Sequence, residues 1–378
     1  MKINKWTSGL AAVGLISLAS VAQAEEKSVP LMTALSSTVI SGYVDTSIVW
    51  NPGTGNANPA PISFNSGKQD GFNLNVVNLT LEKPLDEAQW SAGYKAELLF
   101  GPDAVGFNTS ANANSSADFA IKQAYVALRA PLGNGLDTKV GVLDSPLGYE
   151  SFAGYRNPNY TRSYGYSIEP TQLTGILSTY QICEVLSISG GAANTVNAGI
   201  NQRSDVAESA KAYMGSITLT APESMGVFAG SALYAGVIDG YGSKSEDQTS
   251  VYVGATVATG VTGLKLGASY DEVHHYRGLE NHGYMDAYAA YASFQATEKL
   301  SLHGRAEYAS VDQLFDGNHT RVLALTGTIQ YDLWQHVVSR LEVRWDHATS
   351  GEPFGGTTSG DGNEKNAVMV AVNLVYVF

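Results

Sequence analysis

Apolar and polar residues alternate along most of the chain from Thr38 onward. In residues 299–308, for example, Leu300, Leu302, Ala306 and Tyr308 fall on one face, and charged or polar residues fall on the other. A period of two is that of a β-strand with one apolar and one polar face. The chain is therefore expected to be built of amphipathic strands.

The alternation predicts sixteen strands. They are expected at residues 38–50, 71–82, 89–101, 118–130, 136–143, 171–182, 185–193, 211–220, 225–237, 250–258, 262–271, 284–295, 299–310, 320–331, 336–346 and 365–378. The second segment changes face near Val76 and Val77, which indicates a β-bulge or a misplaced strand edge.

Short and long connections alternate between these segments. The connections after even-numbered segments are short, whereas those after odd-numbered segments include the long stretches 51–70, 102–117, 144–170, 194–210 and 347–364. In an up-and-down meander, all tight turns then lie at one end and all long loops at the other. We therefore expect an all-β fold over 38–378, a transmembrane antiparallel up-and-down β-barrel of about 16 strands with long extracellular loops and short periplasmic turns.

The N-terminus has the pattern of a secretory signal. Lysines precede an apolar stretch at 10–19, and Ala-Gln-Ala at 22–24 has the small-x-small form of a cleavage site. We expect 1–24 to be a cleaved signal peptide and 25–37 to be a short periplasmic segment. Cys183 is the one cysteine, and export without a disulfide framework suits a bacterial envelope better than a small secreted domain.

Composition narrows the classes of partner. The formal charge is −13, so electrostatic binding to nucleic acid is not expected. After the signal, no apolar stretch is long enough for a membrane-spanning helix, so a membrane would be crossed by strands and the apolar faces would meet outer-membrane lipid.

Aromatic residues stand near the ends of the apolar rows, where they would form interfacial girdles. They are Trp50, Trp90, Phe100, Tyr308, Trp334, Trp345, Tyr376 and Phe378. The final strand also resembles the C-terminal signature that the barrel assembly machinery recognises in outer-membrane proteins.

A barrel of about 16 strands leaves an aqueous channel, so passive diffusion of ions and small hydrophilic solutes is the expected function. The charged faces supply candidate pore-lining residues, namely Lys95, Glu97, Arg129, Lys265, Arg305, Glu307, Arg340, Glu342 and Arg344. The alternative is that these charges only join the wall as salt bridges. Acidic loop residues suggest a mild cation preference.

Residues 145–170 are too rich in aromatic side chains for a floppy exterior loop. We expect this segment to fold inward and narrow the pore. The candidate constriction residues are Tyr155, Arg156, Tyr160, Arg162 and Tyr164. The alternative is a loop that packs on the barrel rim or on a neighbouring subunit, and a homotrimer is left open.

The stretches QAYVALRAPLGNGLDTKVGVLDSPLGYES, NPNYTRSYGY and EPTQLTGI, with the final aromatic strand, resemble the beta-barrel porin-2 (OmpL-like) family of bacterial outer-membrane proteins. The resemblance implies an outer-membrane channel without a cofactor and without catalytic residues.

Other chemistry has weak support. His274 and His275, with His282 nearby, lack the spacing of a helical zinc site, and 240–245 (GYGSKS) lacks glycines of a phosphate loop, so no metal or cofactor is expected. Two rivals remain. One is an outer-membrane enzyme of the lipid hydrolase type, with a Ser–His pair on the outer face. The other is a soluble carbohydrate-binding β protein.

Overall fold

The computed structural model describes residues 37–59, 70–104, 107, 118–196, 199–242, 247–274, 284–312, 319–358 and 361–378. The predicted signal peptide, and all but Ser37 of the predicted periplasmic segment, lie outside these ranges. The strands are β1 Val39–Trp50, β2 Gly71–Lys83, β3 Ser91–Phe100, β4 Phe119–Ala130, β5 Leu136–Asp144, β6 Gln172–Gln181, β7 Leu186–Ala193, β8 Ala212–Thr220, β9 Ala232–Tyr241, β10 Asp247–Ala258, β11 Leu264–His274, β12 Met285–Gln295, β13 Leu300–Asp312, β14 His319–Tyr331, β15 Val337–Ser350 and β16 Asn366–Val377.

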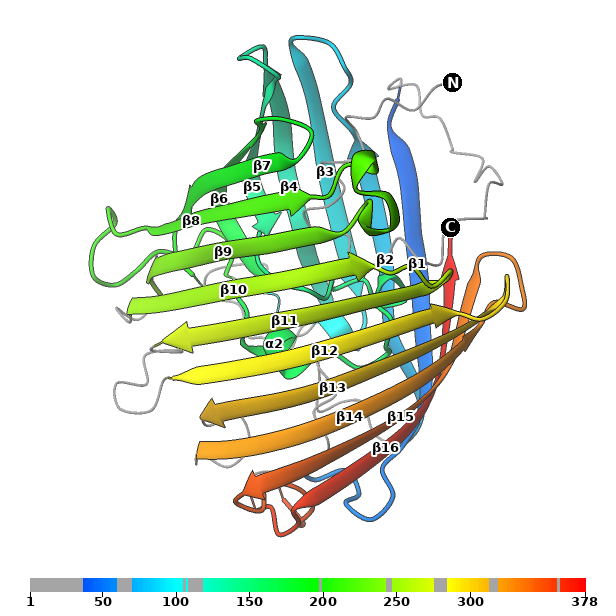
Figure 1. The fold of residues 1–378 in the computed structure, drawn as a ribbon. Coiled ribbons are helices and arrows are strands. Elements are labelled where there is room, and N and C mark those ends of the chain that lie inside the picture. The colour runs from blue at the N-terminus through cyan, green and yellow to red at the C-terminus, as the bar shows by residue number, and fades with distance from the viewer. Residues whose placement is uncertain are drawn as a thin grey trace.

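These sixteen strands form a closed barrel in which each strand pairs antiparallel with its neighbours in the chain. β16 closes the barrel against β1 (Figure 1). Beyond the last ladder pair, Gly42 and Phe378 exchange two backbone hydrogen bonds of 2.9 Å each. Closure leaves no free sheet edge, which is what a membrane requires of strands. The predicted fold class and strand number are confirmed.

The two faces of the wall differ as the alternation predicts. On the outer face, large apolar side chains such as Leu302 and Leu325 are 42% and 47% exposed, and Trp50, Trp90 and Trp334 are also exposed. The opposite row, which points into the barrel, carries polar and charged side chains, most of them buried. This is the inside-out distribution of a membrane barrel.

Two β-bulges turn consecutive residues inward. The β1–β2 register shifts so that Asn75 has no partner of its own, and Asn75 and Val76 are both buried. The bulge expected near Val76 is therefore confirmed. A second bulge in β4 leaves Lys122 out of register with β3 and turns both Lys122 and Gln123 inward. The bulges thus add polar groups to the interior.

The ninth strand, β9, begins later in the chain than the alternation predicts. Residues 225–237 were expected as strand, but a 3-10 helix, η3, occupies Glu223–Phe228 and β9 begins at Ala232. Gly226 and Gly230 adopt positive φ angles of 58° and 78°, which interrupt an extended chain despite its apolar alternation. The connection 221–231 is consequently long and 242–246 is short, so the alternation of connection lengths fails here.

Three further short helices occur in the connections. They are η1 Pro102–Ala104, η2 Gly154–Arg156 and α2 Tyr164–Ile168. The N-cap residue of α2 is Ser163, whose hydroxyl accepts the backbone N–H of Tyr166 at 3.1 Å. Within the described ranges, no helix is long and apolar enough to cross a membrane.

Candidate functional site

The connection 145–171 between β5 and β6 packs against the inner row of the barrel wall. Its helix α2 contacts β11, β12 and β13, and it is seen behind β11 and β12 in Figure 1. Polar contacts to β13 and β15, and apolar contacts to several other strands, hold the connection in place.

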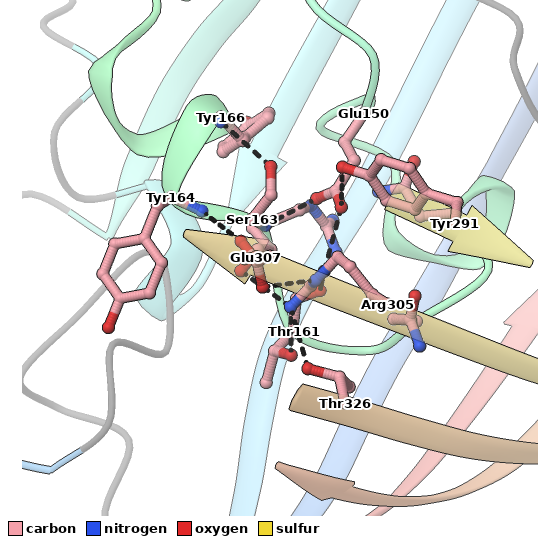
Figure 2. Close-up of polar contacts among 12 residues, drawn as sticks. Glu150, Thr161, Ser163, Tyr164, Tyr166, Tyr291, Arg305, Glu307 and Thr326 are labelled. Atoms are coloured by element: carbon pink, nitrogen blue, oxygen red, sulfur yellow. Dashed lines mark hydrogen bonds and ion pairs between the residues drawn. The ribbon is translucent and has the colours of Figure 1, made fainter. Parts of the chain in front are cut away.

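Arg305 of β13 lies at the centre of a group of polar contacts (Figure 2). Its Nη1 donates to Glu150 Oε1 at 2.9 Å and to the carbonyl of Thr161 at 2.7 Å, and its Nε donates to Glu307 Oε2 at 2.6 Å. Its Nη2 reaches the Arg162 carbonyl at 3.1 Å. Arg305 therefore binds loop backbone and two carboxylates at once, with a side chain that is 0% exposed.

The carboxylates complete this network from the other side. The backbone N–H groups of Ser163 and Tyr164 donate to Glu150 at 2.9 Å and to Glu307 at 2.7 Å, and the Tyr291 hydroxyl donates to Glu150 at 3.1 Å. Each buried charge thus has a partner of opposite charge and further hydrogen bonds, which is the condition for tolerating ions in the interior.

β15 forms a second set of anchors. Glu342 accepts the backbone N–H of Tyr160 at 2.6 Å and that of Thr161 at 2.9 Å. Arg340 donates to the carbonyls of Gly154, Tyr155 and Asn157 at 3.0, 3.0 and 2.8 Å.

Arg344 and Asp346 of β15 hold the start of α2. Arg344 forms an ion pair with Asp346 at 2.8 Å and lies over the Tyr164 ring, 5.2 Å from its centroid. The Tyr164 hydroxyl donates to Asp346 Oδ1 at 2.8 Å. Ring, cation and carboxylate therefore form one buried group.

Apolar side chains of the connection pack in several directions. Phe152 packs with residues of β1 to β4, Tyr149 stacks on Tyr291 with ring centroids 4.1 Å apart, and Ile168 packs with residues of β11 to β16. The connection thus meets the wall on more than one side.

The structure brings five of the nine pore-lining candidates together under this connection, namely Arg305, Glu307, Arg340, Glu342 and Arg344. The other four lie apart. Lys95 forms an ion pair with Glu97 at 3.2 Å, Arg129 binds Asp137 through two 2.6 Å hydrogen bonds, and Lys265 is exposed at the start of β11.

The five constriction candidates differ in how exposed their side chains are. Tyr160 is buried and donates to Ser47 at 2.9 Å, while Arg162 is buried and donates to the carbonyls of Tyr160 and Phe152 at 2.9 and 2.6 Å. Tyr164 is also buried. Tyr155 is half-buried, and Arg156 is the exposed member.

Sequence reasoning missed Glu150, which binds Arg305 and the start of α2. The one local signal was an acidic residue within a segment rich in Tyr and Arg. Asp45 was missed as well. It accepts hydrogen bonds of 2.7 Å from Asn75 and Asn373, which join β1 to both neighbouring strands.

Burial changes the acidity of the loop side chains. Desolvation raises the pKa of the Tyr164 phenol well above its ordinary value, and that of Glu169 is also raised well above the ordinary carboxyl value. For Glu169 the main cause is burial, followed by repulsion from Asp271. Tyr164 is therefore a neutral hydrogen-bond donor.

The described ranges contain no group of His, Cys, Asp and Glu side chains suited to a metal ion. His274 ends β11 and contacts Glu272 at 2.5 Å, while His275 and His282 lie outside the described residues.

A closed sixteen-stranded membrane barrel with a charged interior is the architecture of a porin. The family described as "Putative beta-barrel porin-2, OmpL-like" matches residues 37–378, and the chain belongs to this family. The predicted family and channel class are confirmed, and they indicate the bacterial outer membrane.

Solved structures of other outer-membrane proteins share this fold. The anion-selective porin from Comamonas acidovorans is 14% identical with a TM-score of 0.63, covering 90% of this chain and 99% of that one. The outer-membrane channel DcaP of Acinetobacter baumannii is 13% identical with a TM-score of 0.61, covering 90% and 97%. OmpT of Vibrio cholerae in its trimer form is 11% identical with a TM-score of 0.56, covering 90% and 99%. No curated protein sequence matches the chain.

Proposed function

We propose that this porin lets ions and small hydrophilic solutes diffuse passively through a barrel narrowed by the connection 145–171. The observation that carries the proposal is the set of contacts from Arg305, Arg340 and Glu342 to the loop backbone. A segment bound to the inner wall reduces the cross-section open to water.

In this proposal the nine charged candidates act in two ways. Arg305, Glu307, Arg340, Glu342 and Arg344 fix the position of the loop. Lys95, Glu97, Arg129 and Lys265 belong to the wall outside that anchored region. Of the constriction candidates, Tyr160, Arg162 and Tyr164 face the anchors, and Tyr155 and Arg156 face the remaining passage.

The surroundings of the barrel are part of the proposal. Lipid covers the exposed apolar row, the signal at 1–24 is cleaved on export, and the C-terminal strand is read by the barrel assembly machinery. A homotrimer is proposed because one similar structure is described as a trimer form.

The enzyme alternative has one observation in its favour. His303 Nδ1 and Ser293 Oγ lie 2.9 Å apart. This pair is on the inner row rather than the outer face, and the other ring nitrogen of His303 has no partner among the described residues. A hydrolase would need an acid there to orient the ring.

Liposome swelling tests the proposal. Vesicles containing the purified protein should swell in isotonic sugar solutions, faster for small sugars than for large ones. Vesicles that swell no faster than protein-free vesicles, although the protein migrates as a folded barrel on unheated gels, would refute passive diffusion.

A further inference from the structure

The connection 145–171 covers the inner wall of the barrel more completely at β13 and β15 than at β3, β4 and β5. Beneath the anchored side of the loop, the side chains of Arg305 and Arg344 are 0% and 1% exposed. On the wall formed by β3, β4 and β5, those of Lys95 and Asp144 are 18% and 45% exposed, and those of their partners Glu97 and Lys122 are 10% and 3% exposed. Water therefore reaches the charged row on the β3–β5 side, and a passage would run there.

Two exposed cations mark this side, and each lies on a tyrosine ring. Lys139 of β5 is 5.0 Å from the centroid of Tyr125, and Arg156 of the loop is 5.5 Å from the centroid of Tyr155. Within the described ranges, neither cation forms an ion pair with a carboxylate. A ring positions a cation without neutralising its charge, so both remain available to solutes.

The nearby carboxylates are largely satisfied by other groups. Glu97 accepts hydrogen bonds from Asn78 at 2.9 Å and Gln123 at 2.8 Å, besides its ion pair with Lys95. Asp144 pairs with Lys122.

The two cations act on opposite members of one ion pair. The charge of Arg156 interacts with Glu97, and that of Lys139 interacts with Lys95 and with the carboxylates of Asp144, Glu82 and Asp137. Both cations therefore lie near the Lys95–Glu97 pair. Glu82 lies directly opposite Lys95 on β2, and Asp137 of β5 is paired with Arg129. Lys95, Lys122 and Arg129 are paired with Glu97, Asp144 and Asp137, so Lys139 and Arg156 face one further carboxylate, Glu82, although the chain as a whole is acidic.

We infer that solutes pass beside the β3–β5 wall and that Lys139 and Arg156 make this passage prefer small anions, such as carboxylates and phosphates, over cations. The inference rests on the proposed diffusion function. Fixed charge at a narrow point dominates selectivity because its field is least screened there, whereas charges at a wide mouth are screened by salt.

Reversal potentials in planar bilayers with a potassium chloride gradient test the inference. The native protein should favour chloride, and K139E and R156E should each lower the chloride-to-potassium permeability ratio by about two-fold or more. The double variant should favour potassium. K299E is the matched control, because it changes the net charge equally at an exposed turn, and its ratio should stay at the native value.

Each outcome separates the two hypotheses. A native protein that conducts but favours potassium, or variants whose ratio stays at the native value, would overturn the anion preference and leave diffusion standing. A folded native protein that does not conduct would refute the proposed function itself. Should K139E fail to assemble, K139Q and R156Q carry the same test with a smaller expected shift.

Discussion

The Glu342 carboxylate accepts the backbone N–H of Tyr160 at 2.6 Å, which joins the β5–β6 loop to β15 across 182 residues of sequence. Because the donor is a backbone N–H group, this hydrogen bond does not depend on the side chain of Tyr160. It depends on the carboxylate of Glu342 in the barrel wall. Glu342 is 0% exposed, and Thr161 N and Thr328 Oγ1 also donate to it.

Replacing Glu342 with Gln should loosen the loop. An amide accepts fewer and weaker hydrogen bonds than a carboxylate, so two backbone N–H groups lose charge-assisted bonds. Single-channel recordings should show larger current fluctuations and a higher mean conductance. E272Q on the outer row of β11 is the control, and equal noise in both variants would argue against this anchor.

Replacing Arg305 with Ala should destabilise the barrel by about 3–5 kcal/mol, because Glu150 and Glu307 are left buried without their cation. The midpoint temperature of the heat-modifiable gel shift should fall. R321A removes an exposed arginine at the start of β14 and should leave the midpoint near its native value. A native-like midpoint for R305A would show that the network contributes little to stability.

Gly42 marks the place where the barrel closes. A Cβ atom there would lie 2.2 Å from the Asn78 carbonyl oxygen and 2.8 Å from Cζ of Phe378. G42A should therefore lower the folded yield on refolding into detergent, at a cost of about 1–3 kcal/mol. G304A is the matched control, since no heavy atom lies within 4 Å of its added Cβ. Equal folded yields for G42A and G304A would show that the backbone around Gly42 adjusts to the added methyl group at no measurable cost.

The buried carboxyl group of Glu169 should make the stability of the loop depend on pH. Its folded pKa is raised, so the folded state binds the proton more tightly than the unfolded chain does. The resulting stabilisation is complete below the ordinary carboxyl pKa and is lost as pH rises through the higher folded value. Chymotrypsin cleavage near α2 should therefore speed up from acidic to alkaline pH, beyond the protease's own pH response.

In E169Q this excess pH dependence should disappear, because the amide stays neutral. E208Q removes an exposed carboxylate in another loop and should behave like the native protein. A native cleavage profile that follows the protease alone would contradict the role of Glu169.

The barrel could be predicted from the sequence because the alternation of apolar and polar residues within each short segment shows which face of a strand is apolar. It was insufficient for β9, where the backbone conformation of Gly226 and Gly230 overrides an alternating pattern. It also could not show the anchors of the loop. Glu150 and Arg305 are 155 residues apart, and Gly154 and Arg340 are 186 apart, so no local pattern links them. Tyrosine and arginine content identified the segment but not its partners.

The most direct test of the account is the single-channel conductance of the native protein beside a variant in which residues 152–162 are replaced by a short Gly-Ser linker. Both proteins should conduct, and the conductance of the shortened variant should be at least about two-fold that of the native protein, because removing the segment widens the water-filled cross-section. Equal conductance in two properly folded proteins would contradict the claim that this loop narrows the pore.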